Sequence, residues 1–324
     1  MNILPTLADV REIASDGAYK VIPVSCEILS DFITPVEAIK ILKNVSMHCY
    51  MLESARENEN WGRYTFLGFD PKLEITCAHG EMKIGDIKLK TEHPSDYFRK
   101  ILAEYKSPGF EYLPAFTGGL VGYFSYDYMG YCEPTAKCTV EDTENFQDMD
   151  LMLFDKVIAF DHVRQKIILI VNMSLVDVET GYHKAVMELR QLADLLRNGK
   201  KTRETGGKLQ GEVTELFSKE QFCTMVERAK EHIHEGNIFQ IVLSNRLSVP
   251  FEGSLLNTYR ILRTINPSPY MFYFSGTDVE VAGASPETLV KLKNGTLYTF
   301  PLAGTRPRGK RGGRQRSGKR ITGR

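Results

Sequence analysis

The stretch of the sequence that most constrains the chain is the run 300–309, FPLAGTRPRG, in which a strand-like pattern ends in a glycine. Gly304 lets the backbone come close to a ligand, and Thr305 adds a hydroxyl group and a second backbone N–H donor. Two arginines follow on either side of Pro307, and the prolines stiffen the loop. The run therefore suits a cradle for a carboxylate or a phosphate at the end of a strand, or else a surface loop with solvated arginines.

The residues after this loop, 311–324, include six basic side chains, four glycines and no acidic side chain. With Ile321 as their one apolar side chain, they cannot build a core. Residues 1–310 hold 35 basic and 41 acidic residues, so an acidic body carries a basic tail. We expect a disordered end and no nucleic-acid partner, because the body shows neither a basic face nor a binding motif.

The N-terminus and the cysteines predict a cytoplasmic protein without a membrane partner. The N-terminus has acidic residues early and lacks the apolar segment of a signal peptide, and the longest strong apolar run, Ile167–Val171, is too short to cross a bilayer. The six cysteines contain no Cys-x-x-Cys pair, which fits reduced thiols. Cys132 and Cys138 are the only close pair, and we expect no metal there.

The first half of the chain alternates strand and helix patterns. Pro35 stands at the start of a helical pattern, where its missing N–H does no harm. Aromatic side chains alternate at Tyr64, Phe66 and Phe69, as in a half-buried strand. The expected strands are 23–30, a hairpin of 73–77 and 82–89, and an antiparallel pair of 151–160 and 166–172; the expected helices are 34–42, 95–105 and 181–197.

Three glycines interrupt the strand pattern of Phe116–Asp127. Glycines inside a strand indicate a bulge or the close approach of another backbone. The run is not a G-x-G-x-x-G sequence that opens a helix, which excludes a dinucleotide-binding loop here.

A polar, glycine-containing segment, 198–213, separates the two halves of the chain. Ser218 and Gln221 form the pattern of a capping box at the start of a helix, and Gly236 suits its end. The later expected elements are strands at 239–249, 270–275, 279–283 and 288–292, a helix at 255–264, and a turn at Asn294–Gly295. We predict an N-terminal lobe at 1–197, a linker at 198–217, a second domain at 218–310 and the tail at 311–324.

Six motifs, in order, resemble the chorismate-utilising enzymes, and above all the large subunits of anthranilate synthases. They are LES followed by WGRYTFLGFDP, FTGGLVGYFSYD, NIFQIVLS, NPSPYMF, GASPE and PLAGTRPRG. The resemblance implies an α/β (α+β) fold, a layered antiparallel β-sandwich with helices packed outside. It also implies a lyase of tryptophan biosynthesis that converts chorismate and ammonia to anthranilate and pyruvate. Such enzymes use Mg²⁺, take ammonia from a glutaminase subunit and are inhibited by L-tryptophan.

The resemblance assigns site residues one by one. Gly304 and Thr305 match the substrate-contacting pair, and Thr305 is also counted with the catalytic residues. Glu287 matches a pocket glutamate that can protonate the departing hydroxyl group if burial raises its pKa. Chorismate carries two carboxylates, which suits a loop of N–H donors, a hydroxyl group and arginines.

The resemblance also implies a tryptophan-binding site, where polar groups hold the ammonium and carboxylate and an apolar wall holds the indole. Its residues are Glu53, Ser54, Pro269, Tyr270 and Met271. From the local sequence alone, Glu53 and Ser54 would also suit an ordinary turn at the end of a strand.

Two positions favour the anthranilate branch over related enzymes. Ala303 stands where aminodeoxychorismate synthases typically have lysine, and Gln240 stands where the water-adding isochorismate and salicylate synthases have a lysine base. Aminodeoxychorismate synthase is the alternative activity within the family.

The resemblance stops at Lys310. The family's Mg²⁺ ligands and catalytic histidine lie in segments that follow, so no metal ligands are predicted in this chain. We expect a truncated chain without catalytic activity, whose basic tail comes from a change of reading frame. The alternative is a non-catalytic fragment that binds tryptophan or the glutaminase.

Overall fold

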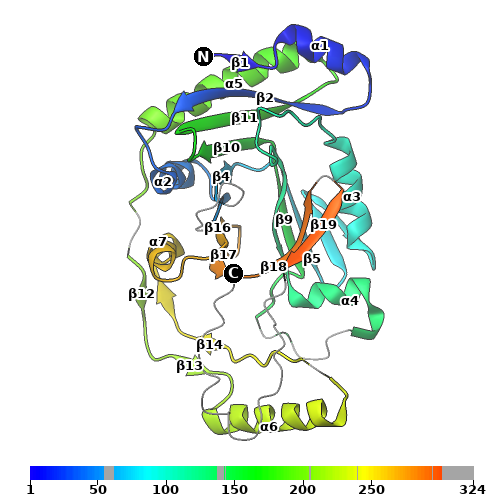
Figure 1. Cartoon of the computed structure of the whole chain (residues 1–324), viewed down its shortest axis with the longest axis vertical. Coiled ribbons are helices and arrows are strands. Elements are labelled where there is room, and N and C mark those ends of the chain that lie inside the picture. Colours follow the sequence, from blue (N-terminus) through cyan, green and yellow to red (C-terminus); the bar gives the residue numbers. More distant parts are fainter. Residues whose placement is uncertain are drawn as a thin grey trace, which may run out of the picture. The chain divides into compact units, whose positions relative to one another are not determined.

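A computed structural model of the chain describes residues 1–54, 62–136, 142, 144–203, 206–238, 240–293 and 295–300 (Figure 1). The chain divides into two compact units, Met1–Ala284 and Ser285–Arg324. Each unit is described by itself below.

The first unit is built on an eight-stranded sheet. Its strand order is β1-β2-β11-β10-β4-β3-β16-β17, and each neighbouring pair from β1 to β16 is antiparallel. The strands are β1 Ile3–Leu4, β2 Val21–Leu29, β3 Cys49–Glu53, β4 Tyr64–Phe69, β10 Lys156–Asp161, β11 Lys166–Ser174, β16 Tyr270–Ser275 and β17 Glu280–Ser285. Segments from both halves of the sequence therefore share one sheet.

A second, five-stranded antiparallel sheet has the order β7-β6-β5-β9-β8. Its strands are β5 Leu73–Ala78, β6 Glu81–Ile84, β7 Ile87–Lys90, β8 Gly119–Phe124 and β9 Met149–Phe154. A cluster of large side chains joins the two sheets, because Tyr50 of β3 packs edge-on against Phe154 of β9 with ring centroids 4.7 Å apart. The buried members of this cluster, from both sheets, are Tyr50, Met152, Phe154 and Phe274.

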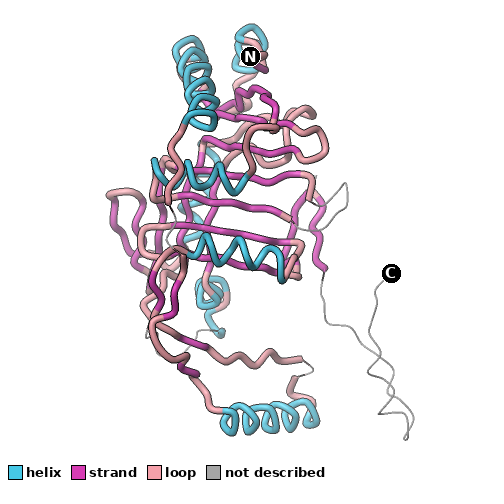
Figure 2. The backbone as a smooth tube through the Cα atoms, turned by 90° about the vertical axis from the view of Figure 1, so that its left-hand side faces the viewer, coloured by secondary structure: helices cyan, strands magenta, loops and turns pink. Residues whose placement is uncertain are grey.

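Helices cover the outer faces of the sheets. α1 (Leu7–Ser15), α2 (Pro35–Val45), α5 (Val178–Asn198) and α7 (Leu255–Ile265) pack on the large sheet through one core cluster, and Figure 2 shows helices in front of its strands. α3 (Pro94–Glu104) and the short α4 (Met129–Cys132) pack on the smaller sheet. Mixed α/β architecture, antiparallel sheets and outer helices confirm the predicted fold class.

Local capping signals fix several helix boundaries. Thr34 caps α2 by accepting a hydrogen bond from the Glu37 N–H at 3.3 Å, and Pro35 stands in the first turn as predicted. Ser218 and Gln221 form the predicted capping box of α6 (Lys219–Glu235), and Gly236 ends the helix in the left-handed conformation, with φ of 81°.

The remaining strands are short pairs. β12 (Lys208–Leu209) pairs with β15 (Phe251–Glu252), and β13 (Thr214–Glu215) pairs with β14 (Leu247–Ser248). In the second unit, β18 (Thr288–Lys293) and β19 (Thr296–Phe300) form a hairpin. Its turn contains Gly295 with φ of 76°, at the predicted position.

Three expected strands are wrong in their extent. The run 151–160 is divided at Asp155, so that β9 belongs to the small sheet and β10 to the large one. The run 82–89 is divided around Gly85, whose φ of 55° turns the chain between β6 and β7. Within the described part of 239–249, only Leu247–Ser248 is a strand.

The compact units do not coincide with the predicted lobes. The boundary between units follows Ala284, whereas the sequence places a linker at 198–217. β16 and the first residues of β17 belong to the predicted second domain, yet they complete the sheet of the first lobe. The functional division into 1–197 and 218–310 stays a prediction, and the tail 311–324 lies outside the described residues.

None of the helices in the described parts of the chain has the length and apolar character needed to cross a bilayer.

Candidate functional site

Pairing of β3 with β16 brings two distant predicted segments together. Met271 lies opposite Glu53 in the antiparallel ladder, and Phe272 lies opposite Leu52. β3 ends at Glu53 and β16 begins at Tyr270. Ser54 therefore follows Glu53, and Tyr270 precedes Met271, at the end of the ladder.

Apolar and polar groups meet at this end. Met271 and Pro269 are buried, whereas Tyr270 and Ser54 are half-buried. The structure therefore places the five residues predicted for tryptophan binding on two adjacent segments, with an apolar wall beside polar groups.

Glu53 is held by side chains of α7. Its Oε1 atom accepts a hydrogen bond from the Tyr259 hydroxyl group at 2.5 Å and lies 2.5 Å from Nε of Arg263, whose Nη2 donates to Oε2 at 2.9 Å. Only 7% of the Glu53 side chain is exposed. Burial and the adjacent Glu53 carboxylate raise the pKa of Tyr259, which therefore remains a donor.

His162, in the turn after β10, is electrostatically coupled to Glu53. Its Nε2 atom lies 2.8 Å from the Thr65 hydroxyl group. Burial lowers the pKa of His162, and the negative charges of Glu53 and Asp161 oppose that effect. His162 is thus kept neutral near neutral pH.

The other end of α7 is also fixed. Glu280 of β17 accepts hydrogen bonds from the Leu255 N–H at 2.9 Å, from the Ser254 hydroxyl group at 2.9 Å and from Nζ of Lys43 at 3.0 Å. Burial favours a raised pKa for Glu280, but the hydrogen bonds from Tyr273, Leu255 and Lys43 lower it overall. A carboxylate at the helix N-terminus also matches the helix dipole.

Sequence reasoning did not identify Tyr259, Arg263 or His162. Their contacts with β3 depend on residues far apart in the chain, and none of them belongs to a local motif. A charged residue near the end of an otherwise apolar helix face, as at Arg263, is the only signal the sequence offers.

The predicted substrate residues fall in the second unit. Glu287 is exposed in the turn between β17 and β18, where its N–H donates to the Ser285 hydroxyl group at 3.4 Å. Gly304 and Thr305 lie outside the described residues. The catalytic roles of Glu287 and Thr305 stay predictions.

The described residues contain no group of three or more His, Cys, Asp or Glu side chains that could hold a metal ion. Cys132 is exposed, and its predicted neighbour Cys138 lies outside the described residues. The expected Mg²⁺ is therefore not assigned to any of these side chains.

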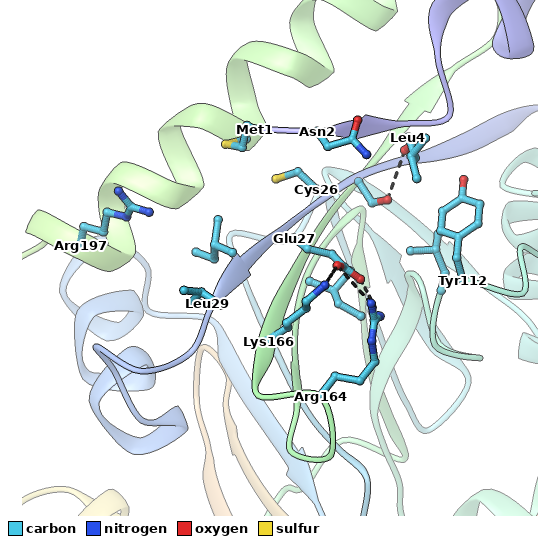
Figure 3. Close-up of a pocket in the computed structure, with 14 residues that line it drawn as sticks. Met1, Asn2, Leu4, Cys26, Glu27, Leu29, Tyr112, Arg164, Lys166 and Arg197 are labelled. Atoms are coloured by element: carbon cyan, nitrogen blue, oxygen red, sulfur yellow. Dashed lines mark hydrogen bonds and ion pairs between the residues drawn. The ribbon is translucent and has the colours of Figure 1, made fainter.

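Among the cavities in the described part of the first unit, three lie elsewhere. The first, about 660 Å³, borders β2, where Figure 3 shows Arg164 and Lys166 converging on Glu27. The second, about 890 Å³, lies along α7 and includes Ile261 and Arg263. The third, about 400 Å³, lies between β11 and α5. Of the residues predicted for substrate or tryptophan binding, those that the structure describes line none of these three cavities.

Comparisons with known proteins agree on one family. The sequence matches the family described as "chorismate binding enzyme" over residues 47–320. This match continues beyond Lys310 and corrects the predicted end of the resemblance.

Curated relatives are named anthranilate synthase component 1. That of Acetivibrio thermocellus is 36% identical, with 94% of this chain and 64% of the relative covered. Those of Aquifex aeolicus and Pseudomonas aeruginosa are 35% identical, with 96% and 92% of this chain and 64% and 62% of the relatives covered. The chain thus spans less than two thirds of the length of these relatives.

A solved structure, anthranilate synthase component I from Streptococcus pneumoniae TIGR4, superposes with a TM-score of 0.63 at 28% identity. The superposition covers 83% of this chain and 59% of that one. The architecture of sheets and helices described above is therefore similar to that of a solved protein.

Proposed function

The chain belongs to the family of chorismate-binding enzymes, and from this we propose that it forms part of the large subunit of an anthranilate synthase. In that reaction ammonia adds to chorismate, the ring hydroxyl group leaves as water and pyruvate is eliminated to give anthranilate. The observation that carries the proposal is identity of 35–36% over 92–96% of this chain to relatives of that name.

We assign chorismate to the loop that contains Gly304 and Thr305, with Glu287 as the acid that protonates the leaving hydroxyl group. Backbone N–H groups and a threonine hydroxyl group suit a carboxylate of the substrate. Glu287 is exposed in this structure, so it would act as an acid only once bound substrate shields it from water. Mg²⁺ in this family neutralises charge on the substrate, but the described residues offer no site for it and we derive no step through it.

We further propose that L-tryptophan binds at the end of the β3–β16 ladder and inhibits the enzyme. Support comes from the apolar wall of Met271 and Pro269 beside the half-buried Ser54. An amino acid with an indole side chain needs both kinds of surface.

The proposed partner is a glutaminase subunit that supplies ammonia, which fits the relatives' designation as component 1. A non-catalytic chain that binds only tryptophan or this glutaminase is the alternative, which the pairing of β3 with β16 supports. Aminodeoxychorismate synthase is the alternative within the family. It is disfavoured because Ala303 stands where those enzymes typically have lysine.

Two ligands and two variants test the function. Calorimetry is expected to show binding of chorismate and of L-tryptophan to the 324-residue chain. Thr305→Ala is expected to weaken chorismate binding alone, and Ser54→Ala to weaken tryptophan binding alone. Tryptophan binding without chorismate binding would establish the non-catalytic alternative, and binding of neither ligand would refute the proposed function.

A further inference from the structure

Glu53 connects β3 to α7 through both of its carboxylate oxygens. Nε and Nη2 of Arg263 contact Oε1 and Oε2 at 2.5 and 2.9 Å, and the Tyr259 hydroxyl group donates to Oε1 at 2.5 Å. A two-point contact between a guanidinium and a carboxylate fixes the orientation of both groups. We refer to Glu53, Tyr259 and Arg263 as the α7 clamp.

The α7 clamp stands at the last registered pair of the β3–β16 ladder, Glu53 opposite Met271. Ser54 directly follows Glu53 on one strand, and Tyr270, with Pro269 before it, directly precedes Met271 on the other. α7 ends at Ile265 and leads through the connection 266–269 into β16, and Figure 1 shows α7 beside β16. The clamp therefore holds the residue before Ser54 and the helix that leads into Pro269 and Tyr270.

We infer that Arg263 and Tyr259 are positioning residues of the tryptophan site and act on it through Glu53; this inference rests on the proposed function. Because both Glu53 oxygens are bonded to α7, Glu53 supports the site and does not bond the ligand through its carboxylate. The groups it positions are Ser54 and the backbone of Pro269 and Tyr270, which face the ammonium and carboxylate of the amino acid.

A positioning role and a purely structural role predict different effects on two ligands, L-tryptophan and indole. Loss of the clamp should disturb the polar segments, whereas Met271 remains paired in the sheet. L-tryptophan uses both the polar groups and the apolar wall, but indole uses the wall alone. The ratio of the two affinities therefore separates positioning from general destabilisation.

The test compares Arg263→Lys with a matched control. Lysine keeps the positive charge but cannot make the two-point contact. Arg263→Lys is expected to weaken L-tryptophan binding roughly tenfold, the factor that a charge-assisted hydrogen bond supplies, and to leave indole binding unchanged. Tyr259→Phe keeps the packing of the ring and is expected to act in the same direction with a smaller change.

Arg164→Lys is the control, because Arg164 makes a similar contact with Glu27 on β2, at 2.6 and 3.3 Å. It should leave the affinity for both ligands unchanged. Two outcomes would overturn the inference without affecting the proposed function. In the first, Arg263→Lys weakens L-tryptophan and indole binding equally. In the second, Arg263→Lys leaves L-tryptophan binding unchanged although Ser54→Ala weakens it. If the Arg263→Lys variant does not fold, the ratio of the L-tryptophan and indole affinities of Tyr259→Phe provides the same test. A wild-type chain that binds no L-tryptophan would refute the proposed tryptophan site itself.

Discussion

The carboxyl group of Asp150 lies against Gly276 where the two sheets meet: a Cβ atom on Gly276 would stand 3.3 Å from Oδ2 of Asp150. Asp150 belongs to β9 of the small sheet, and Gly276 follows β16 of the large sheet. Asp150 is 4% exposed, and its Oδ1 atom has no hydrogen-bond partner. Burial, reinforced by the negative charges of Glu74 and Asp278, raises the pKa of Asp150 from 3.8 to about 7.

We predict that Asp150→Asn stabilises the protein at pH 8 and not at pH 4. The folded-state pKa lies above the unfolded value, so the folded state holds the proton more tightly and stability falls as pH rises from about 4 to 7. Removing the charge should raise the free energy of unfolding at pH 8 by about 2–4 kcal/mol. Urea unfolding of both proteins at the two pH values measures this difference.

Asp148 provides the control, since its Oδ2 atom accepts hydrogen bonds from the His79 N–H at 2.8 Å and the Tyr131 hydroxyl group at 2.7 Å. Asp148→Asn should destabilise the protein by about 1–2 kcal/mol at pH 8, because charge-assisted hydrogen bonds are weakened. A stabilising effect of Asp148→Asn, or none for Asp150→Asn, would contradict this account of the sheet contact.

Gly122→Ala is predicted to disrupt the pairing of β8 with β9. A Cβ atom at this position would lie 1.9 Å from the carbonyl oxygen of Asp150, a backbone atom that cannot move without breaking the ladder. We expect a loss of about 2–3 kcal/mol in the free energy of unfolding. Gly109→Ala, where the new methyl group meets no atom within 4 Å, should change stability by less than about 0.5 kcal/mol. Similar effects of the two substitutions in thermal unfolding would count against the close approach.

Met271→Ala should weaken both stability and tryptophan binding. The side chain is buried against the large core, so its truncation is expected to cost about 2–5 kcal/mol in the free energy of unfolding. Calorimetry below the unfolding transition should also show weaker L-tryptophan binding, because the apolar wall recedes. Unchanged affinity in a folded Met271→Ala chain would remove Met271 from the proposed site.

Assayed as a polypeptide of 324 residues, the chain is predicted to form no anthranilate from chorismate, ammonium and Mg²⁺. It spans 62–64% of the length of three curated relatives named for that activity. Losing metal-based charge neutralisation costs several kcal/mol in a transition state, and each 1.36 kcal/mol is about tenfold in rate. The fluorescence of anthranilate measures the product. Mg²⁺-dependent fluorescence that Thr305→Ala abolishes would show that these residues already form a complete catalytic set.

Local sequence indicated the helices α2, α3, α5, α6 and α7, whereas α1 and α4 were not predicted. The capping box of Ser218 and Gln221, the stop at Gly236 and the first-turn Pro35 each act through neighbours within a few residues. The glycines near residue 120 were interpreted as a bulge or as close backbone approach, and close approach is confirmed at Gly122, where a Cβ atom would lie 1.9 Å from the carbonyl oxygen of Asp150. At Gly119 a Cβ atom would meet only the side chain of Phe116, at 4.0 Å. The roles of Glu287, Gly304 and Thr305 stay predictions.

Only the tertiary structure decided how strands are shared between sheets and how the candidate site is supported. Nothing in the apolar run 151–160 indicates that the chain leaves one sheet at Asp155 and enters another. Motifs identified Glu53 and Met271, but their register opposite each other comes from the pairing of β3 with β16. The bonds from Tyr259 and Arg263 to Glu53 span 206 and 210 residues. Contacts at such separation depend on how whole elements pack, since no local preference of the sequence encodes which distant side chains will meet.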